Sequence, residues 1–215
     1  MKVIQTENGK LSILMGKSGL GKSTIAVYDS LDHIREGEKV LFFSYEYPQC
    51  IIYNKLINHF DLKWQDLFKV NIIDSNGLNL DNVLSYIEKS DASIVYIDYL
   101  DLLRNETYKN EIDDVKKNQN DQIICSKLAQ LAEEKNINIV ALVQEKESKT
   151  FEETISQLNT ITSLIKKQNV VKMFIGRDGI FSSAINCNDI SHVILVDGYN
   201  LKHFSSINVK EVYKD

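Results

Sequence analysis

Residues 16–23 read Gly16-Lys17-Ser18-Gly19-Leu20-Gly21-Lys22-Ser23, which matches the pattern G-x-x-x-x-G-K-[ST] at every fixed position. An apolar run, Lys10–Met15, precedes this loop, and a helical stretch, Lys22–Glu36, follows it. Glycines let the backbone turn tightly enough for successive N–H groups to point at phosphate oxygens. A glycine-rich turn before a helix is the alternative, but the complete match between a strand and a helix favours a phosphate-binding loop.

The residues of this loop have separate predicted tasks in binding ATP and Mg²⁺. Lys22 is predicted to reach the β- and γ-phosphates, and the Ser23 hydroxyl is predicted to bind Mg²⁺. The first turn of the following helix adds the positive end of its dipole, which favours an anion. The predicted cofactor-binding residues are Gly16, Lys17, Ser18, Gly19, Leu20, Gly21, Lys22, Ser23 and Thr24.

Outward from the loop, short apolar runs alternate with longer helical stretches. This alternation predicts right-handed crossovers and an α/β fold, with a mostly parallel central sheet flanked by helices. The last strands are expected to be antiparallel additions at one edge. No linker is visible, so we expect one domain over residues 1–215. The predicted strands are Lys10–Met15, Lys39–Ser44, Val70–Asp74, Ser93–Asp98, Ile137–Val143, Val170–Ile175, His192–Val196 and Ile207–Tyr213, and the predicted helices are Lys22–Glu36, Pro48–Phe60, Leu80–Lys89, Asp121–Lys135 and Thr150–Lys167.

Two polar stretches follow buried strands and are expected to be mobile loops. They are Arg104–Gln122 and Glu145–Thr150. Both would emerge from the carboxyl ends of strands, where open α/β sheets bind their ligands.

The composition is that of an ordinary globular protein, with 43% hydrophobic and 26% charged residues. The formal net charge of −5 argues against coating nucleic acid by bulk charge, although a locally basic groove stays possible. The three cysteines fit no zinc pattern and suggest a reducing compartment. No apolar run approaches the roughly 18 residues of a membrane span, so we expect a cytoplasmic protein.

Three polar residues end predicted strands at the edge of the sheet where the loop lies. Asp98 closes an apolar strand, and a carboxylate there would hold Mg²⁺ through water. Glu46 follows the neighbouring strand and is the candidate carboxylate that orients and deprotonates the attacking water. Gln144 ends a third strand, and its amide can donate a hydrogen bond to the γ-phosphate. Solvated polar residues at strand ends are the alternative for each of the three.

Together these segments resemble RecA-like P-loop ATPases, and most closely the motor domain of DnaB-type replicative helicases. Residues 40–48 (VLFFSYEYP) are similar to that family's strand ending in a catalytic glutamate. Residues 94–103 (IVYIDYLDLL) resemble its Walker B segment, and residues 126–144 (SKLAQLAEEKNINIVALVQ) resemble the helix and strand that end in a sensor glutamine. The resemblance covers about residues 10–144, thins after them, and returns weakly at 182–196.

The resemblance implies a homo-oligomer, a ring or filament with ATP between subunits, where a basic residue of the neighbour completes each site. Arg177 is a candidate for this residue. The family's final strand usually supplies an arginine, whereas residues 208–215 contain only Lys210 and Lys214 as basic candidates. The family also implies a loader or primase as partner. Because the chain starts about ten residues before its first predicted strand, we expect a bare motor without the family's N-terminal domain.

Single-stranded DNA is the partner that the resemblance implies, held by loops that follow the central strands. The candidate DNA contacts are Lys146, Lys149, Lys166 and Lys167. Such lysines would bind phosphates without sequence preference and in a salt-sensitive way. Lysines that only solvate their loops are the alternative.

Three functions stay open at this point. The first is an ATP-driven motor on single-stranded DNA in replication or recombination, and the chain is also similar to short phage RecA-like proteins that anneal strands. The second is a RecA-like regulatory switch that acts on protein partners. The third, a small-molecule phosphotransferase, needs an arginine-rich lid, and the chain's only arginines are Arg35, Arg104 and Arg177.

Overall fold

The computed structural model describes residues 4, 6–109, 114–146, 150–176, 192–196 and 204–208. Within them an eight-stranded sheet has the order β3-β2-β4-β5-β1-β6-β7-β8. Strands β1 to β7 run parallel, and β8 pairs antiparallel with β7 at the edge. The strands are β1 Leu11–Gly16, β2 Val40–Ser44, β3 Val70–Asp74, β4 Ile94–Asp98, β5 Asn138–Gln144, β6 Val170–Gly176, β7 His192–Val196 and β8 Phe204–Asn208.

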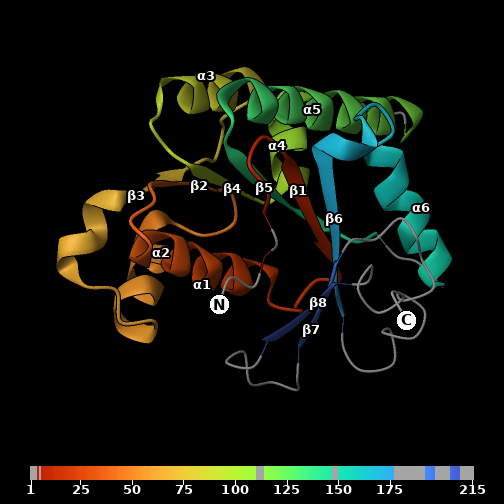
Figure 1. The fold of residues 1–215 in the computed structure, drawn as a ribbon. Coiled ribbons are helices and arrows are strands. Elements are labelled where there is room, and N and C mark those ends of the chain that lie inside the picture. The colour runs from red at the N-terminus through yellow and green to blue at the C-terminus, as the bar shows by residue number, and fades with distance from the viewer. Residues whose placement is uncertain are drawn as a thin grey trace.

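Helices cover both faces of this sheet, as Figure 1 shows. Helices α1 and α2 pack on one face, and α3 to α6 pack on the other, each face with its own buried apolar cluster. Strands β1, β2, β4 and β5 are buried along almost their whole length, as expected of parallel strands covered on both sides. The helices are α1 Lys22–Arg35, α2 Gln49–Asn54, α3 Leu80–Lys89, α4 Leu100–Thr107, α5 Asp114–Lys135 and α6 Phe151–Ile161.

The α/β fold class and the mostly parallel sheet are therefore confirmed. The antiparallel edge is confirmed for β8, whereas β7 continues the parallel run beside β6. Strand β8 also begins earlier than predicted and covers Phe204–Asn208. The antiparallel register with β7 sets these bounds: His192 aligns with Asn208, and Val196 aligns with Phe204. Residues 209–213 of the predicted strand lie outside the described residues.

The polar stretch Arg104–Gln122 was expected to be a mobile loop, and this expectation is wrong for most of it. Helix α4 extends to Thr107, and α5 begins at Asp114, seven residues before the predicted start. Buried apolar residues, Leu100 and Leu103 on α4 and Ile124 and Leu128 on α5, pack both helices on the sheet. Asn120 and Asp121 of α5 are also buried, although both are polar. Figure 1 shows α5 as a long helix over the same face as α3.

Two predicted helices differ from the observed ones in detail. The predicted Pro48–Phe60 helix is α2 followed by a π-helical turn, η1, over Lys55–His59. The predicted Thr150–Lys167 helix ends at Ile161, where Thr162 leaves the helical conformation with φ −100° and ψ 4° and tight turns follow. Two short 3₁₀ turns, η2 Trp64–Lys69 and η3 Lys167–Asn169, were not predicted.

Strand register brings the predicted polar residues together at the carboxyl ends of the central strands. Ser44 of β2 aligns with Asp98 of β4, and Gly16 of β1 aligns with Gln144 of β5. The carboxyl ends of these strands therefore meet where the loop turns into α1. None of the helices in the described part of the chain is long and apolar enough to cross a membrane.

Candidate nucleotide-binding site

The loop between β1 and α1 has the backbone that a phosphate cradle requires. Gly19 and Gly21 adopt positive φ angles of 76° and 85°, which favour glycine over residues with a side chain. Gly16 lies so close to β6 that an added Cβ would come within 2.2 Å of the Ile175 side chain. No side chain caps the start of α1, and its first turn contains no acidic residue. Its N–H groups and dipole are thus free to face an anion.

Lys22 is the first residue of α1, and its side chain reaches back into the loop. Its ammonium group donates hydrogen bonds to the carbonyl oxygens of Gly16, at 2.8 Å, and Lys17, at 2.9 Å. Burial lowers the pKa of Lys22, and four nearby carboxylates, those of Asp98, Asp101, Glu46 and Glu145, act in the opposite direction. The lysine is held inside the loop by main-chain acceptors that a phosphate can replace.

Ser23 and Asp98 form a pair beside Lys22. The Ser23 hydroxyl lies 3.0 Å from Asp98 Oδ1 in a hydrogen bond, and the Asp98 side chain is buried. The pKa of Asp98 is raised to about 7, mainly by burial; the Ser23 hydrogen bond acts to lower this pKa, and the charge of Glu46 acts to raise it. Within the described residues Asp98 Oδ2 is buried and has no hydrogen-bond partner. A buried carboxylate oxygen that lacks a donor, next to a hydroxyl, fits a Mg²⁺ site.

The donor set also fits the way in which Mg²⁺ is usually bound. The described residues contain no group of three or more His, Cys, Asp or Glu side chains arranged to hold a metal. Mg²⁺ commonly takes one or two protein oxygens and completes its octahedron with water and substrate phosphates. Ser23 and Asp98 supply such a partial set, which needs the phosphates of a nucleotide to be complete.

The raised pKa of Asp98 gives a testable pH dependence of stability. The folded chain keeps this proton at pH values where the unfolded chain has released it, so stability falls as pH rises from about 4 to about 7. Asp98→Asn mimics the protonated form. Without metal or nucleotide, we expect the variant to be more stable than the wild type at pH 8, by on the order of 2–3 kcal/mol, with a much smaller difference at pH 5.

Thermal unfolding midpoints at the two pH values measure this difference. The matched control is Asp91→Asn, because the Asp91 carboxylate is exposed and pairs with Lys39 at the surface. We expect no comparable gain from this control. An Asp98→Asn variant that is equally destabilised at pH 5 and pH 8 contradicts the assignment of a buried, unpaired carboxylate.

Glu46 and Lys55 bring opposite charges to the same edge of the sheet. Glu46 is exposed two residues beyond β2, and its charge acts on the pKa of both Lys22 and Asp98. Lys55, from η1, lies with its ammonium group 4.8 Å from the centre of the Tyr47 ring. Its charge lowers the pKa of Asp98, so it also acts on the candidate metal-binding carboxylate. Lys55 was not predictable as part of the site, because only the folded α2–η1 segment brings it near Asp98.

Gln144 lies directly beside the loop. Its residue pairs with Gly16 in the sheet, and the N–H of the next residue, Glu145, donates to the Gly16 carbonyl at 3.0 Å. The Gln144 backbone N–H donates to Asp101 Oδ2 at 3.0 Å. The main chain at Gln144 is therefore fixed by the Asp101 side chain and, through the next residue, by the Gly16 carbonyl, while the Gln144 side chain is half-buried.

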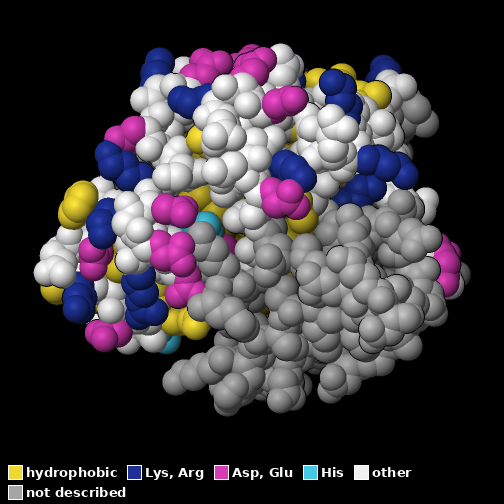
Figure 2. Space-filling view, viewed as in Figure 1, with side chains coloured by type: hydrophobic (Ala, Val, Ile, Leu, Met, Phe, Trp, Pro, Cys, Tyr) yellow, Lys and Arg dark blue, Asp and Glu magenta, His cyan; other side chains and the backbone are white. Residues whose placement is uncertain are grey.

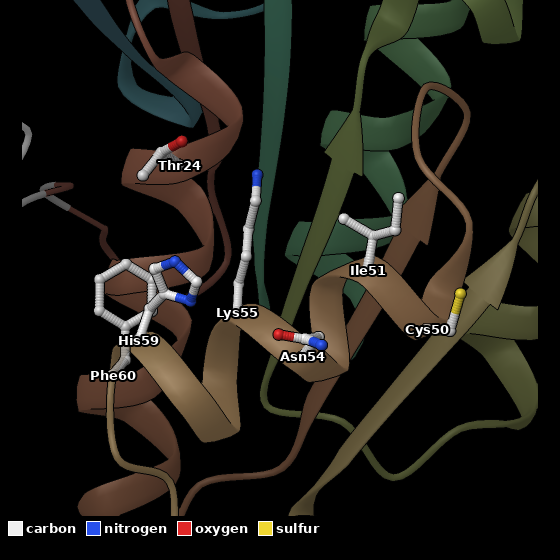
Figure 3. A pocket seen from close by; sticks show the side chains of 7 residues that line it. All are labelled: Thr24, Cys50, Ile51, Asn54, Lys55, His59 and Phe60. Carbon is white, nitrogen blue, oxygen red and sulfur yellow. The ribbon is translucent and has the colours of Figure 1, made fainter.

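A groove of about 600 Å³ lies between α1 and the α2–η1 segment (Figure 3), and Thr24 in the first turn of α1 is one of its lining residues. Figure 3 shows the Lys55 side chain extending between Thr24 and Ile51, with Asn54 below it. The lining residues are Thr24, Cys50, Ile51, Asn54, Lys55, His59 and Phe60.

No protein-family model and no curated protein matches this sequence. Among solved structures the chain is similar to one described as an ATPase domain, which is of the DnaB type, with a TM-score of 0.56 and 15% sequence identity. The similarity covers 94% of this chain and 77% of that one. This chain has the fold of a RecA-like ATPase domain of the DnaB type. The predicted resemblance is confirmed at the level of the fold.

The RecA-like fold separates the lysines that were grouped as candidate DNA contacts. Lys146 is exposed just beyond the carboxyl end of β5, at the same edge as the loop. Lys166 and Lys167 are exposed just before the amino end of β6, at the opposite edge of the parallel sheet. The structure therefore does not bring these lysines together. Lys149, Arg177, Lys210 and Lys214 lie outside the described residues, so their roles stay predictions.

Acidic and basic side chains are interspersed over the described part of the face in Figure 2. This distribution agrees with the formal net charge of −5 and shows no extended basic surface on that face. On that face, any attraction for a nucleic acid would be local.

Proposed function

We propose that this RecA-like chain is an ATP-hydrolysing motor that depends on single-stranded DNA, of the DnaB-type helicase kind, acting in replication or recombination. The observation that carries the ATPase part is the Ser23–Asp98 pair beside Lys22, inside a glycine loop that opens a helix. A glycine turn with only a structural role has no need of a buried carboxylate oxygen without a donor.

In this proposal ATP binds with its phosphates in the loop, and Lys22 exchanges its two carbonyl partners for phosphate oxygens. Ser23 and Asp98 would hold Mg²⁺, which neutralises charge on the β- and γ-phosphate oxygens when it is bound. Glu46 orients a water molecule and accepts its proton while the water oxygen attacks the γ-phosphorus. The bond from the γ-phosphorus to the ADP oxygen breaks, and the Gln144 amide donates to the transferred group.

We further propose a homo-oligomer, a ring or filament, in which a neighbour completes each site with a cation. The two described arginines are already engaged: Arg104 pairs with two carboxylates, and Arg35 donates to the Phe60 carbonyl. Arg177 is thus the remaining arginine for this role, with Lys210 and Lys214 as the lysine candidates. A loader or primase stays a proposed partner, by analogy with the DnaB type alone.

The test of the DNA-dependent function is ATP hydrolysis with and without single-stranded DNA. We expect at least about tenfold stimulation by single strands, weakening with salt because phosphate contacts release counterions. Indifference to DNA contradicts the motor and favours the regulatory switch. A forked duplex then separates unwinding from strand annealing, since only a helicase releases the labelled strand in an ATP-dependent way.

Two lysine variants locate the DNA contact. Lys146→Ala, at the carboxyl edge of the sheet, is expected to weaken single-stranded DNA binding and to reduce the slope of log affinity against log salt by about 1. Lys166→Ala, at the opposite edge, is the matched control and is expected to leave both unchanged. Fluorescence anisotropy of a labelled oligonucleotide at several salt concentrations measures them. Equal effects of the two variants contradict a contact at the carboxyl edge.

A further inference from the structure

A cluster of one arginine and two carboxylates lies beneath the tip of β5. Arg104 of α4 donates through Nη2 to Asp101 Oδ1 and through Nη1 to Asp121 Oδ2, both at 2.9 Å. The side chains of Asp101 and Arg104 are 17% and 16% exposed, and that of Asp121 is 5% exposed. Geometry and burial of this kind distinguish the cluster from a surface ion pair, which contributes little.

The cluster joins the nucleotide site to α5. At one end the second carboxylate oxygen of Asp101 accepts the Gln144 backbone N–H at 3.0 Å. At the other end Asp121 lies on α5 and receives Arg104. An unbroken chain of hydrogen bonds therefore runs from the strand tip beside Gly16, through Asp101 and Arg104, to α5.

A second connection between the same elements runs along a polar cavity of about 240 Å³ that Asp101, Arg104 and Asp121 also line. Lys146, two residues beyond Gln144, donates from its backbone N–H to Gln157 Oε1 at 3.1 Å. Its ammonium group lies 3.4 Å from Asn118 Oδ1 on α5. The segment that leaves β5 therefore contacts α5 at Asn118 as well as through Arg104.

Charge balance makes this cluster sensitive to the position of the strand tip. Burial raises the pKa of Asp121, and Arg104 acts in the opposite direction. The two carboxylates share one guanidinium, so a displacement of Asp101 leaves Arg104 with a single partner and leaves a carboxylate oxygen without a donor. Uncompensated charges of this kind are costly in a half-buried site, so α4 and α5 are expected to follow a movement of Asp101.

We propose that Asp101 and Arg104 are positioning residues, which hold the tip of β5 beside the phosphate loop and transmit its nucleotide-dependent position to α5. This inference rests on the proposed function, because it requires that a nucleotide occupies the loop and contacts Gln144. Neither Asp101 nor Arg104 is proposed to touch the nucleotide. Asp101 acts through the Gln144 main chain, and Arg104 acts through Asp101 and Asp121.

Amide hydrogen exchange with a non-hydrolysable ATP analogue and Mg²⁺ tests the inference. In the wild type we expect the analogue to slow exchange in the loop, residues 16–24, and to change it in the first turns of α5, residues 114–122. In Asp101→Ala we expect protection of the loop to remain and the change in α5 to be lost. Asp91→Ala, which removes only a surface ion pair with Lys39, is the control and is expected to behave as the wild type.

Each outcome of this experiment has one meaning. A wild type whose loop gains no protection overturns the proposed function and, with it, the inference. Loop protection without any change in α5, or with the same change in Asp101→Ala, overturns the inference and leaves the proposed function standing.

Steady-state kinetics give a second readout that loss of structure alone would not reproduce. We expect Arg104→Ala to lower kcat about 2- to 30-fold while the KM for ATP stays within about threefold, and Arg104→Lys to recover part of the loss. The assays are run well below each variant's unfolding midpoint. A kcat for Arg104→Ala equal to that of the wild type contradicts a positioning role. So does an equal rise of the KM for ATP in Arg104→Ala and Arg104→Lys without any change of kcat.

Discussion

Replacing Lys22 by alanine is expected to lower kcat/KM for ATP by at least about 10²–10³-fold, the largest effect of any single change in the loop. The Lys22 ammonium lies within the loop and already bonds two of its carbonyl oxygens, so phosphates that enter the loop meet this cation first. Alanine leaves the glycine backbone intact but removes the charge that balances the β- and γ-phosphates. Phosphate release and binding of a fluorescent ATP analogue measure the loss.

Lys17→Ala is the matched control for this change. Lys17 belongs to the same loop, but its side chain is exposed, and only its backbone carbonyl contacts Lys22. We expect this variant to keep turnover within about threefold of the wild type. A Lys22→Ala protein that hydrolyses ATP as fast as the Lys17→Ala protein removes Lys22 from the phosphate site.

Glu46→Gln is expected to keep nucleotide binding and to lower kcat by about 10²–10⁴-fold, the usual contribution of a general base. The glutamine has the same shape and can still contact water, but it cannot accept the proton of the attacking water. Because Glu46 is exposed beyond β2, the change leaves the buried core untouched. Single-turnover hydrolysis and the affinity for an ATP analogue, measured on the same preparation, separate chemistry from binding.

The control for Glu46 is Glu88→Gln, an exposed glutamate on α3, on the opposite face of the sheet from α1. It is expected to have wild-type kcat and affinity. Normal turnover by Glu46→Gln means that another group takes the proton. A loss of affinity that matches the loss of kcat means that Glu46 holds the nucleotide and is not the base.

The phosphate loop and its companions at the strand ends were predictable from sequence because their signal is local. Gly16 to Ser23 match a contiguous pattern, and Asp98 and Gln144 each end a continuous apolar run. Parallel strands place their carboxyl ends at one edge, so the pattern of runs already implies that these residues approach one another. The observed register, Gly16 with Gln144 and Ser44 with Asp98, agrees with that expectation.

The contacts that tune the site were not predictable, because they join residues far apart in sequence. Asp101 and Arg104 read as ordinary polar residues after a strand, and only the packing of α4 brings Asp101 to the Gln144 N–H. The same holds for Asp121, which begins the predicted helix but whose contact with Arg104 depends on how α4 and α5 pack together. The seven residues of α5 that precede Asp121 were not predicted as helix, because the stretch that contains them is polar on average.

The candidate DNA-contact lysines lie close together in sequence but not in the fold. Lys146 and Lys166 are only 20 residues apart, and both flank the segment that contains α6. Because α6 carries the chain from the carboxyl end of β5 back to the amino end of β6, the two lysines lie at opposite edges of the sheet. Proximity in sequence was a poor guide here, since each crossover between parallel strands runs back along the full length of the strands.

A crystal structure of the chain with Mg²⁺ and a non-hydrolysable ATP analogue would be the most direct examination of the nucleotide site. We expect the triphosphate within the amides of residues 16–24, Lys22 Nζ on the β- and γ-phosphate oxygens, and Mg²⁺ bound by Ser23 Oγ and held by Asp98 through water. Nucleotide bound elsewhere, with Lys22 still on the Gly16 and Lys17 carbonyls and Ser23 still on Asp98, would contradict the account.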